Sequence, residues 1–152
     1  MNTMTITRRL LTTAVLAGTV ALVATGCSAE ELQQEFGDAW AVTYEVTVDQ
    51  PVGAELRDVD VEGAEVRGDD LVVHELGAQT TDGEADGGAG SSWHHDSIVY
   101  PERPASMSAT PPQDATATCR VLLDGVRELA SATSSAPGEP VRCALTMPAY
   151  TG

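Results

Sequence analysis

The chain has no lysine and only eight arginines, so acidic side chains dominate its charge. Its 152 residues include 23 aspartates and glutamates, which gives a formal net charge of −15. A chain this acidic is repelled by nucleic acids and by anionic lipid head groups, and we expect neither as a partner. The simplest interpretation of the charge is a solvated acidic surface that favours solubility and discourages self-association.

Aromatic residues and catalytic motifs are also scarce. Two Trp, three Tyr and one Phe are the only aromatic side chains, so the core must be built from Val, Leu and Ala. No Gly-x-Ser-x-Gly, P-loop or Gly-x-Gly-x-x-Gly sequence occurs, and these motifs mark many hydrolases and nucleotide-binding proteins. The serines lie in expected loops without a basic partner nearby in the sequence. We therefore expect no catalytic activity and no cofactor.

The one long apolar run lies near the N-terminus. Arg8 and Arg9 precede residues 10–23, which carry no charge, and residues 24–27 follow with the sequence Ala-Thr-Gly-Cys. A basic start, a short apolar stretch and small residues before a cut are typical of a secretory signal. The cysteine at the cut resembles the lipobox of bacterial lipoproteins. An uncleaved single-span anchor is the alternative, but a run of about 14 residues is short for a span of roughly 20.

The lipobox resemblance implies that residues 1–26 are removed and that Cys27 becomes a lipidated N-terminus. Two or more acyl chains hold a protein firmly at a membrane, which predicts a location on the outer face of a bacterial cytoplasmic membrane. The mature chain would keep six arginines against 23 acids, a formal net charge of −17. Adjacent arginines in the signal leave both the general secretory and the twin-arginine export routes open.

Beyond Cys27 the sequence predicts an all-β domain. Residues 27–39 are polar and acidic and are expected to form a tether. Short segments of alternating apolar residues, bounded by turns that contain Gly, Pro and Asp, then predict strands. These segments are 40–48, 54–61, 71–76, 93–100, 105–110, 116–123, 126–132 and 141–147. About seven such strands indicate a β-sandwich over residues 40–148, and the polar segment 79–92 is expected to be a mobile loop.

Two cysteines remain if Cys27 carries lipid. Cys119 and Cys143 would then leave no odd thiol, and an exported protein meets oxidising conditions. A disulfide closing a loop of about 25 residues would stabilise the fold by roughly 3 kcal/mol. A metal or redox pair is the alternative, but no Cys-x-x-Cys sequence and no nearby histidine supports it.

The C-terminal half resembles the MmpS-type (mycobacterial membrane protein, small) family. The resemblance rests on residues 119–126, Cys-Arg-Val-Leu-Leu-Asp-Gly-Val, on Cys143 and on the strand that begins at Trp93. The opening strand with Val-Thr-Tyr-Glu-Val at 42–46 also fits. This resemblance implies an immunoglobulin-like sandwich without catalysis. It also implies an accessory role beside a large RND-type exporter of the MmpL kind, which carries lipids or siderophores.

Two groups of side chains could bind a metal ion. His94, His95 and Asp96 are adjacent, but neighbouring residues on a strand face opposite sides, so both imidazoles cannot easily reach one ion. Residues 82–87 mimic the first half of a calcium loop through Asp82, Glu84 and Asp86. The twelfth position of that loop would be Trp93 instead of a bidentate glutamate. We expect no metal at either place.

Candidate partner contacts are Trp93 and Tyr100, although Trp93 and Trp40 are more simply interpreted as core residues. The acidic, glycine-rich segment 79–92 supports a second hypothesis, an envelope lipoprotein that binds a small ligand or a cation. A structural surface lipoprotein without a transporter is a third. The oligomeric state does not follow from the sequence.

Overall fold

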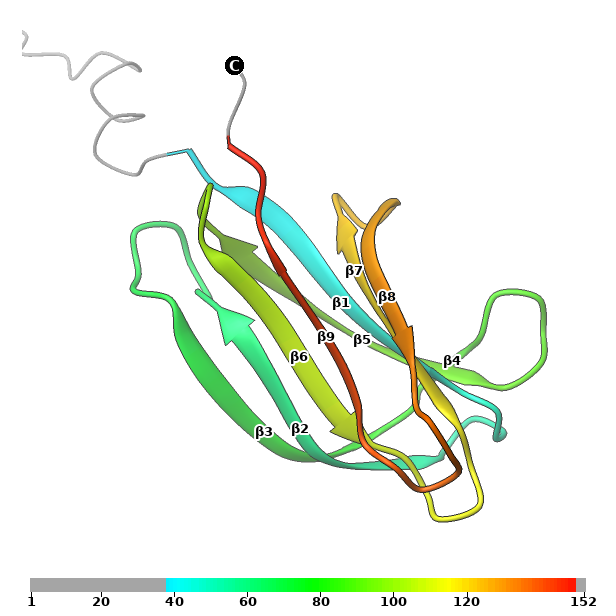
Figure 1. Ribbon diagram of the computed structural model, residues 1–152. Helices are drawn as coiled ribbons and strands as arrows, with labels where there is room; N and C mark the ends of the chain where they lie inside the picture. Colours follow the sequence, from blue (N-terminus) through cyan, green and yellow to red (C-terminus); the bar gives the residue numbers. More distant parts are fainter. Residues whose placement is uncertain (1–37, 150–152) are drawn as a thin grey trace, which may run out of the picture.

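Residues 38–149 of the computed structural model form two antiparallel β-sheets packed face to face (Figure 1). The described residues contain nine strands and no helix. The strands are β1 (Trp40–Val48), β2 (Glu55–Gly63), β3 (Val72–Thr80), β4 (Gly83–Glu84), β5 (Ser91–Val99), β6 (Pro104–Thr110), β7 (Ala117–Leu123), β8 (Arg127–Thr133) and β9 (Val141–Thr146). The prediction of an all-β, immunoglobulin-like sandwich is confirmed.

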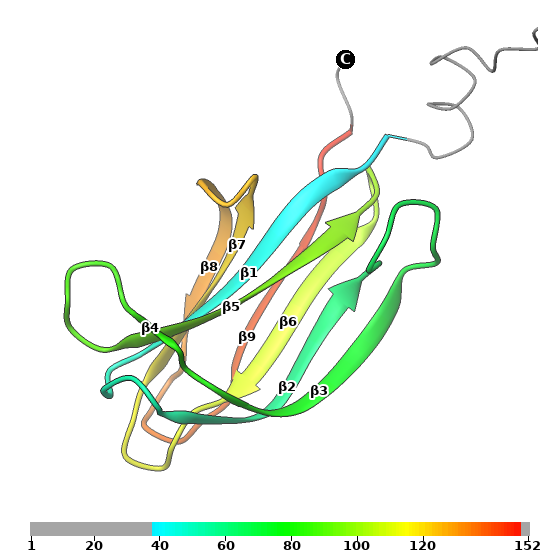
Figure 2. The same cartoon turned by 180° about the vertical axis from the view of Figure 1, so that it is seen from behind.

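The two sheets have different strand orders. The first sheet runs β4-β5-β1-β7-β8, and the second runs β3-β2-β6-β9. Figure 2 shows the first sheet from its outer side, with β1 between β5 and β7. β3 is therefore one edge of the second sheet, and its other edge, β9, lies beside β8 across the sandwich.

β1 lies at the centre of the first sheet, and its sequence alternates strictly. Its valines and Tyr44 face the core, while threonines and Glu45 face solvent. It pairs with β5 over nine residues, from Trp40 opposite Val99 to Val48 opposite Ser91. It pairs with β7 over seven residues. A strand hydrogen-bonded on both sides with one buried face has a fixed register.

The core between the sheets consists mainly of valine and alanine, as the scarcity of aromatic residues predicted. Cys119 on β7 and Cys143 on β9 form a disulfide that joins the two sheets, with their Cα atoms 6.0 Å apart. The predicted disulfide is thus confirmed. The largest fully buried side chains are Tyr44, Leu56, Met107, Met147, Val42, Val46, Val48, Val59, Val61, Val99, Val121 and Val141.

The prediction that segment 79–92 forms one continuous loop was wrong. β3 continues to Thr80, β4 occupies Gly83–Glu84, and β5 already begins at Ser91. These residues have no large apolar side chains, so hydrophobic alternation gave no signal. β4 has no counterpart among the predicted strands, and it brings the total among the described residues to nine. The predicted signal, Cys27 and most of the tether lie outside the described residues.

The described residues begin and end at the same end of the sandwich. Trp40 Nε1 donates a hydrogen bond to the Pro148 carbonyl at 3.1 Å, so the first strand and the last described residues are in contact (Figure 1). We call this the proximal end, and it carries segments 64–71, 100–103, 124–127 and 147–149. The opposite, distal end carries segments 49–54, 81–90, 111–116 and 134–140.

Candidate functional site

Among the described residues, β3 is an outer strand of the second sheet. Among residues 38–149, β3 pairs only with β2, from Gly63 opposite Val72 to Glu55 opposite Thr80. Val72 is 48% exposed and Val73 is 59% exposed. Edge strands usually carry lysine, proline or a bulge that blocks further pairing, and β3 has neither lysine nor proline. We call residues 72–76 the β3 edge.

A bulge limits the β3 edge to its first half. The register between β2 and β3 shifts around Val59, opposite Gly77. Gly77 has a φ of +67° and Asp58 has a φ of +49°. A bulge with positive φ at these residues bends and twists the strand, and it interrupts regular pairing there. The regular stretch that remains therefore runs from Val72 to Glu75, opposite Gly63 to Asp60.

Trp93 lies under this side of the sandwich and is only 7% exposed. Its ring stacks on the His95 imidazole, with centroids 6.1 Å apart and 14° between the planes. Trp93 is therefore a core residue with little surface for a partner. The suggestion of a direct partner contact at Trp93 does not hold, because β5 turns the indole toward the second sheet.

His95 and His74 face the same region from opposite sheets. His74 Nε2 lies 3.1 Å from the Gly63 carbonyl oxygen, and its Nδ1 lies 4.0 Å from Glu65 Oε1. Burial lowers the pKa of His95, and a positive charge on His74 lowers it further, while Asp96 and Glu65 act in the opposite direction. The lowered pKa favours the neutral form of His95 behind the β3 edge.

Tyr100 braces the loop that leads into β3. Its hydroxyl donates to the Asp69 carbonyl at 2.8 Å and accepts from the Gly68 amide at 2.9 Å. Its side chain remains half-buried, so part of the ring faces solvent beside the β3 edge. Its role as a partner contact stays a prediction.

The alternation of His94, His95 and Asp96 follows the strand geometry that the sequence predicted. His95 points inward onto Trp93, while His94 and Asp96 are exposed on the other face. Asp96 Oδ1 accepts a hydrogen bond from Thr43 Oγ1 at 2.7 Å. Within the part of the chain that the structure describes, no group of three or more His, Cys, Asp or Glu side chains could hold a metal ion.

Thr81 anchors the acidic segment that follows β3. It is 1% exposed, and its Oγ1 accepts from the amides of Gly53 and Ala54 and from the Ser91 hydroxyl, at 3.2, 2.9 and 2.8 Å. Hydrogen bonds in a buried setting hold a segment in place because leaving them unmade is costly. Loop 85–90 therefore starts from a fixed point beside the β1–β2 turn.

Loop 85–90 covers a polar cavity on the outer face of the first sheet. The cavity measures about 330 Å³ and is lined by Thr47, Val48, Asp49, Ala85, Asp86, Ala89, Thr116, Thr118 and Arg120. Arg120 binds the Glu45 carboxylate and lies 3.4 Å from Asp86 Oδ2. The hydrogen bond to Glu45 is the main cause that raises the pKa of Arg120. The guanidinium therefore keeps its positive charge, which the carboxylates of Glu45 and Asp86 balance.

Asp49 closes the other side of this cavity. Its carboxylate accepts from the Thr116 hydroxyl at 2.7 Å and from the Thr116 amide at 2.8 Å. The hydroxyl bond is the first cause that lowers the pKa of Asp49. The cavity thus presents hydroxyl groups and carboxylates whose charges are largely engaged. Sequence reasoning missed it because it is formed by residues up to about 70 positions apart, such as Asp49 and Thr116, 67 positions apart.

Comparison with family models, with curated proteins and with solved structures finds no match to this chain. The resemblance to the MmpS-type family therefore stays a prediction. No helix among residues 38–149 has the length and apolarity needed to cross a membrane. Cys27, the predicted lipidation site, lies outside the described residues.

Proposed function

We propose that the chain is a lipid-anchored, extracytoplasmic accessory protein that assists an RND-type exporter of lipids or siderophores by protein–protein binding. The signal-like N-terminus with Cys27 and the resemblance of residues 119–126 and 143 to MmpS-type proteins support this proposal. It has no catalytic step. The observation that carries the binding role is the β3 edge, whose apolar residues and backbone groups face solvent.

Binding would occur by strand addition. An extended segment of the exporter's extracytoplasmic domain would pair with residues 72–76, where backbone groups supply affinity and Val73 supplies an apolar contact. The acyl chains on Cys27 would hold the protein at the membrane surface. Anchoring both partners in one membrane raises their effective concentration, so a modest contact suffices.

Val73→Lys tests this proposal directly. Val73 is 59% exposed, so the variant should fold normally, while a charged side chain blocks strand addition at an edge. We expect about a tenfold fall in the amount of neighbouring RND exporter that co-purifies, corresponding to about 1.4 kcal/mol. The matched control is Val52→Lys, because Val52 is 50% exposed on the distal end. Equal recovery of the exporter by both variants would contradict the proposal.

A second candidate function rests on the cavity beneath loop 85–90. Its volume of about 330 Å³ and its hydroxyl-rich lining suit a small polar ligand, in line with an envelope lipoprotein that captures a ligand or cation. Titration calorimetry with calcium, zinc and iron–siderophore complexes tests it. Heats that are flat for all three exclude this version, and heats abolished by Asp49→Ala support it.

A further inference from the structure

The proximal end of the sandwich presents a hollow with a mixed polar and apolar lining, beside the point where the described residues enter the domain. The hollow measures about 480 Å³ and is lined by Trp40, Leu123, Asp124, Val126, Arg127, Pro148 and Ala149. Val126, in the β7–β8 turn, is 83% exposed and is the most exposed of the large hydrophobic residues in the described chain. A large apolar side chain held in solvent by a tight turn is available to a partner surface.

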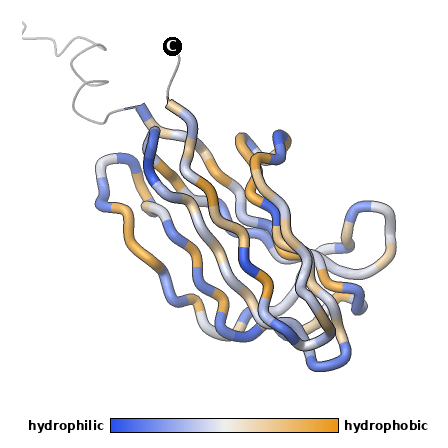
Figure 3. The backbone as a smooth tube through the Cα atoms, viewed as in Figure 1, coloured by the Kyte–Doolittle hydropathy of each residue, from blue (hydrophilic) through white to orange (hydrophobic). Residues whose placement is uncertain are grey.

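Further apolar side chains surround this end. Val66 is 56% exposed in segment 64–71, and Val72 is 48% exposed where β3 begins. The distal loops expose only Val52 to a similar degree. Figure 3 shows the hydropathy of these turns along the backbone. The exposed apolar surface is therefore concentrated toward the end where the described residues start.

Three arginines belong to the proximal segments, while Arg57 and Arg120 contact the distal segments through Pro111 and Asp86. Arg67 donates to the Ala39 carbonyl at 3.5 Å, the Arg103 carbonyl accepts from the Met147 amide at 2.9 Å, and Arg127 lines the hollow. These are three of the six arginines among the described residues. The distal segments 49–54, 81–90, 111–116 and 134–140 contain six acidic residues and no basic residue.

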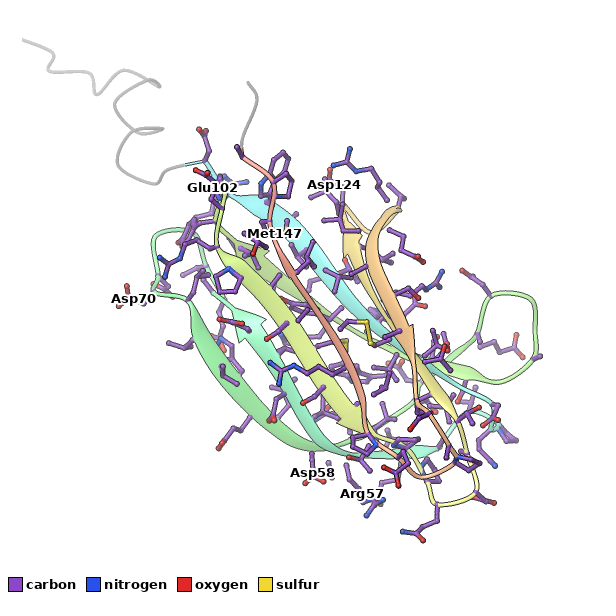
Figure 4. The ribbon with its side chains drawn as sticks, in the orientation of Figure 1. Arg57, Asp58, Asp70, Glu102, Asp124 and Met147 are labelled. Carbon is purple, nitrogen blue, oxygen red and sulfur yellow. A yellow bond between two sulfur atoms is a disulfide. The ribbon has the colours of Figure 1, made fainter. Side chains whose placement is uncertain are left out.

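The proximal end is still not cationic overall. It carries acidic side chains beside the arginines, including Glu102 and Asp124, which Figure 4 places near Met147 at this end, far from Arg57 and Asp58. A contact driven by attraction to anionic lipid alone does not fit this mixture. A contact through apolar and aromatic side chains, with arginines placed to meet phosphate groups, does fit.

We propose that the proximal end is a membrane-contact surface, seated on the phospholipid head-group layer through Trp40 and Val126, with Arg127 beside the phosphates. This inference rests on the proposed lipid anchor at Cys27. Cys27 precedes Asp38 by 11 residues, and a chain of that length spans at most about 40 Å. An anchored domain therefore stays close enough for its proximal end to rest on the bilayer. In that orientation, the distal loops point away from the membrane, and β3 runs along the side of the domain.

Fluorescence quenching tests the contact, because the chain has only two tryptophans. The full chain is joined to phosphatidylcholine vesicles through Cys27, by its own acyl groups or, where that thiol is free, by a maleimide phospholipid. Cys119 and Cys143 do not compete because they form a disulfide. Vesicles with brominated acyl chains should quench Trp40, whereas Trp93 is 7% exposed in the core and serves as the internal reference.

The variants separate the contact from simple anchoring. Trp40→Phe should abolish the quenching and leave the Trp93 emission unchanged. Val126→Asp should lose most of the quenching, while Val52→Asp, an exposed turn valine at the distal end, should retain it. In phosphatidylcholine vesicles the quenching should persist when the salt concentration rises, because an apolar contact is not screened.

Several results would overturn the inference. One is an anchored protein that floats with the vesicles while Trp40 is unquenched. Another is equal quenching in Val126→Asp and Val52→Asp. Crosslinking of the proximal ends of two copies, with Trp40 unquenched, would assign the surface to self-association instead. Mass spectrometry of the native protein tests acylation separately, so loss of the proposed anchor and loss of the membrane contact are distinguishable.

Discussion

Tyr44 shows how one polar atom links the two sheets. Its side chain is fully buried, and its hydroxyl donates to the carbonyl of Glu62 on β2, in the opposite sheet. Burial, followed by the negative charge of Glu62, raises the pKa of Tyr44, so the hydroxyl stays protonated as a donor. A buried hydroxyl that finds its partner costs little, whereas its absence leaves a carbonyl without that donor.

Tyr44→Phe should therefore destabilise the domain by about 1–2 kcal/mol, because the Glu62 carbonyl loses a buried donor. Urea denaturation followed by circular dichroism measures the loss. Tyr100→Phe is the matched control, since Tyr100 also donates to a backbone carbonyl but does so at the surface. Water can replace that bond, so we expect a change within about 0.5 kcal/mol. Equal losses for the two variants would contradict this account.

The segment from Thr81 to Gly90 has no large hydrophobic side chain. Hydrogen bonds of Thr81 and the close approach of Gly90 to β1 hold it in place. Loop 85–90 ends at Gly90, whose φ is +108°. A Cβ built there would lie 2.2 Å from the Val48 carbonyl oxygen, so the loop packs directly against the end of β1. Gly88 has a φ of +73° but nothing within 4 Å of such an atom. The two glycines share a positive φ, which would strain any substitute, and differ in packing.

Gly90→Ala should release loop 85–90 from β1, whereas Gly88→Ala should keep it docked. Both alanines pay about 1–2 kcal/mol for a left-handed backbone, but only Gly90→Ala adds the clash with Val48. Hydrogen exchange at the Ala85 amide, which donates to the Gly90 carbonyl at 3.2 Å, reports the difference. The expected result is faster exchange in Gly90→Ala than in Gly88→Ala. The same exchange rate in both would show that the steric argument is wrong.

At the scale of the whole molecule, a covalent bond supplements a core that is poor in aromatic residues. The disulfide between Cys119 and Cys143 connects β7 to β9 and so joins the two sheets. The bond closes a loop with a sequence separation of 24. Such a crosslink stabilises mainly by restricting the unfolded chain, by roughly 3 kcal/mol at this length.

Replacing both cysteines by alanine should lower the free energy of unfolding by roughly 3 kcal/mol. The measurement is urea denaturation of the variant and of the native protein. Reduction of the native protein with dithiothreitol should move its midpoint toward that of the variant. An unchanged midpoint after reduction that mass spectrometry has verified would contradict a stabilising role for the bond.

The strands with a buried, alternating face could be predicted from local sequence. Residues 40–48 alternate over their whole length, and the Asp124-Gly125 pair marks the β7–β8 hairpin, with positive φ at both residues. β4 and the start of β5 could not be predicted. Their positions depend on Thr81, whose partners Gly53 and Ala54 lie 28 and 27 residues away. Contacts at that separation leave no periodic pattern in either segment.

The candidate surfaces, like the strands, combine features that follow from local sequence with features that only long-range contacts decide. The sequence by itself determined the two-sided character of most strands, the pairing of the last two cysteines and the acidic balance of charge, because these follow from side-chain alternation and from counting. Only the tertiary structure decided that β3 is an edge and that Trp40, Val126 and Pro148 meet at one end. Those facts depend on which strands become neighbours. That choice is made by the packing of two sheets around one core, and no local stretch of sequence contains it.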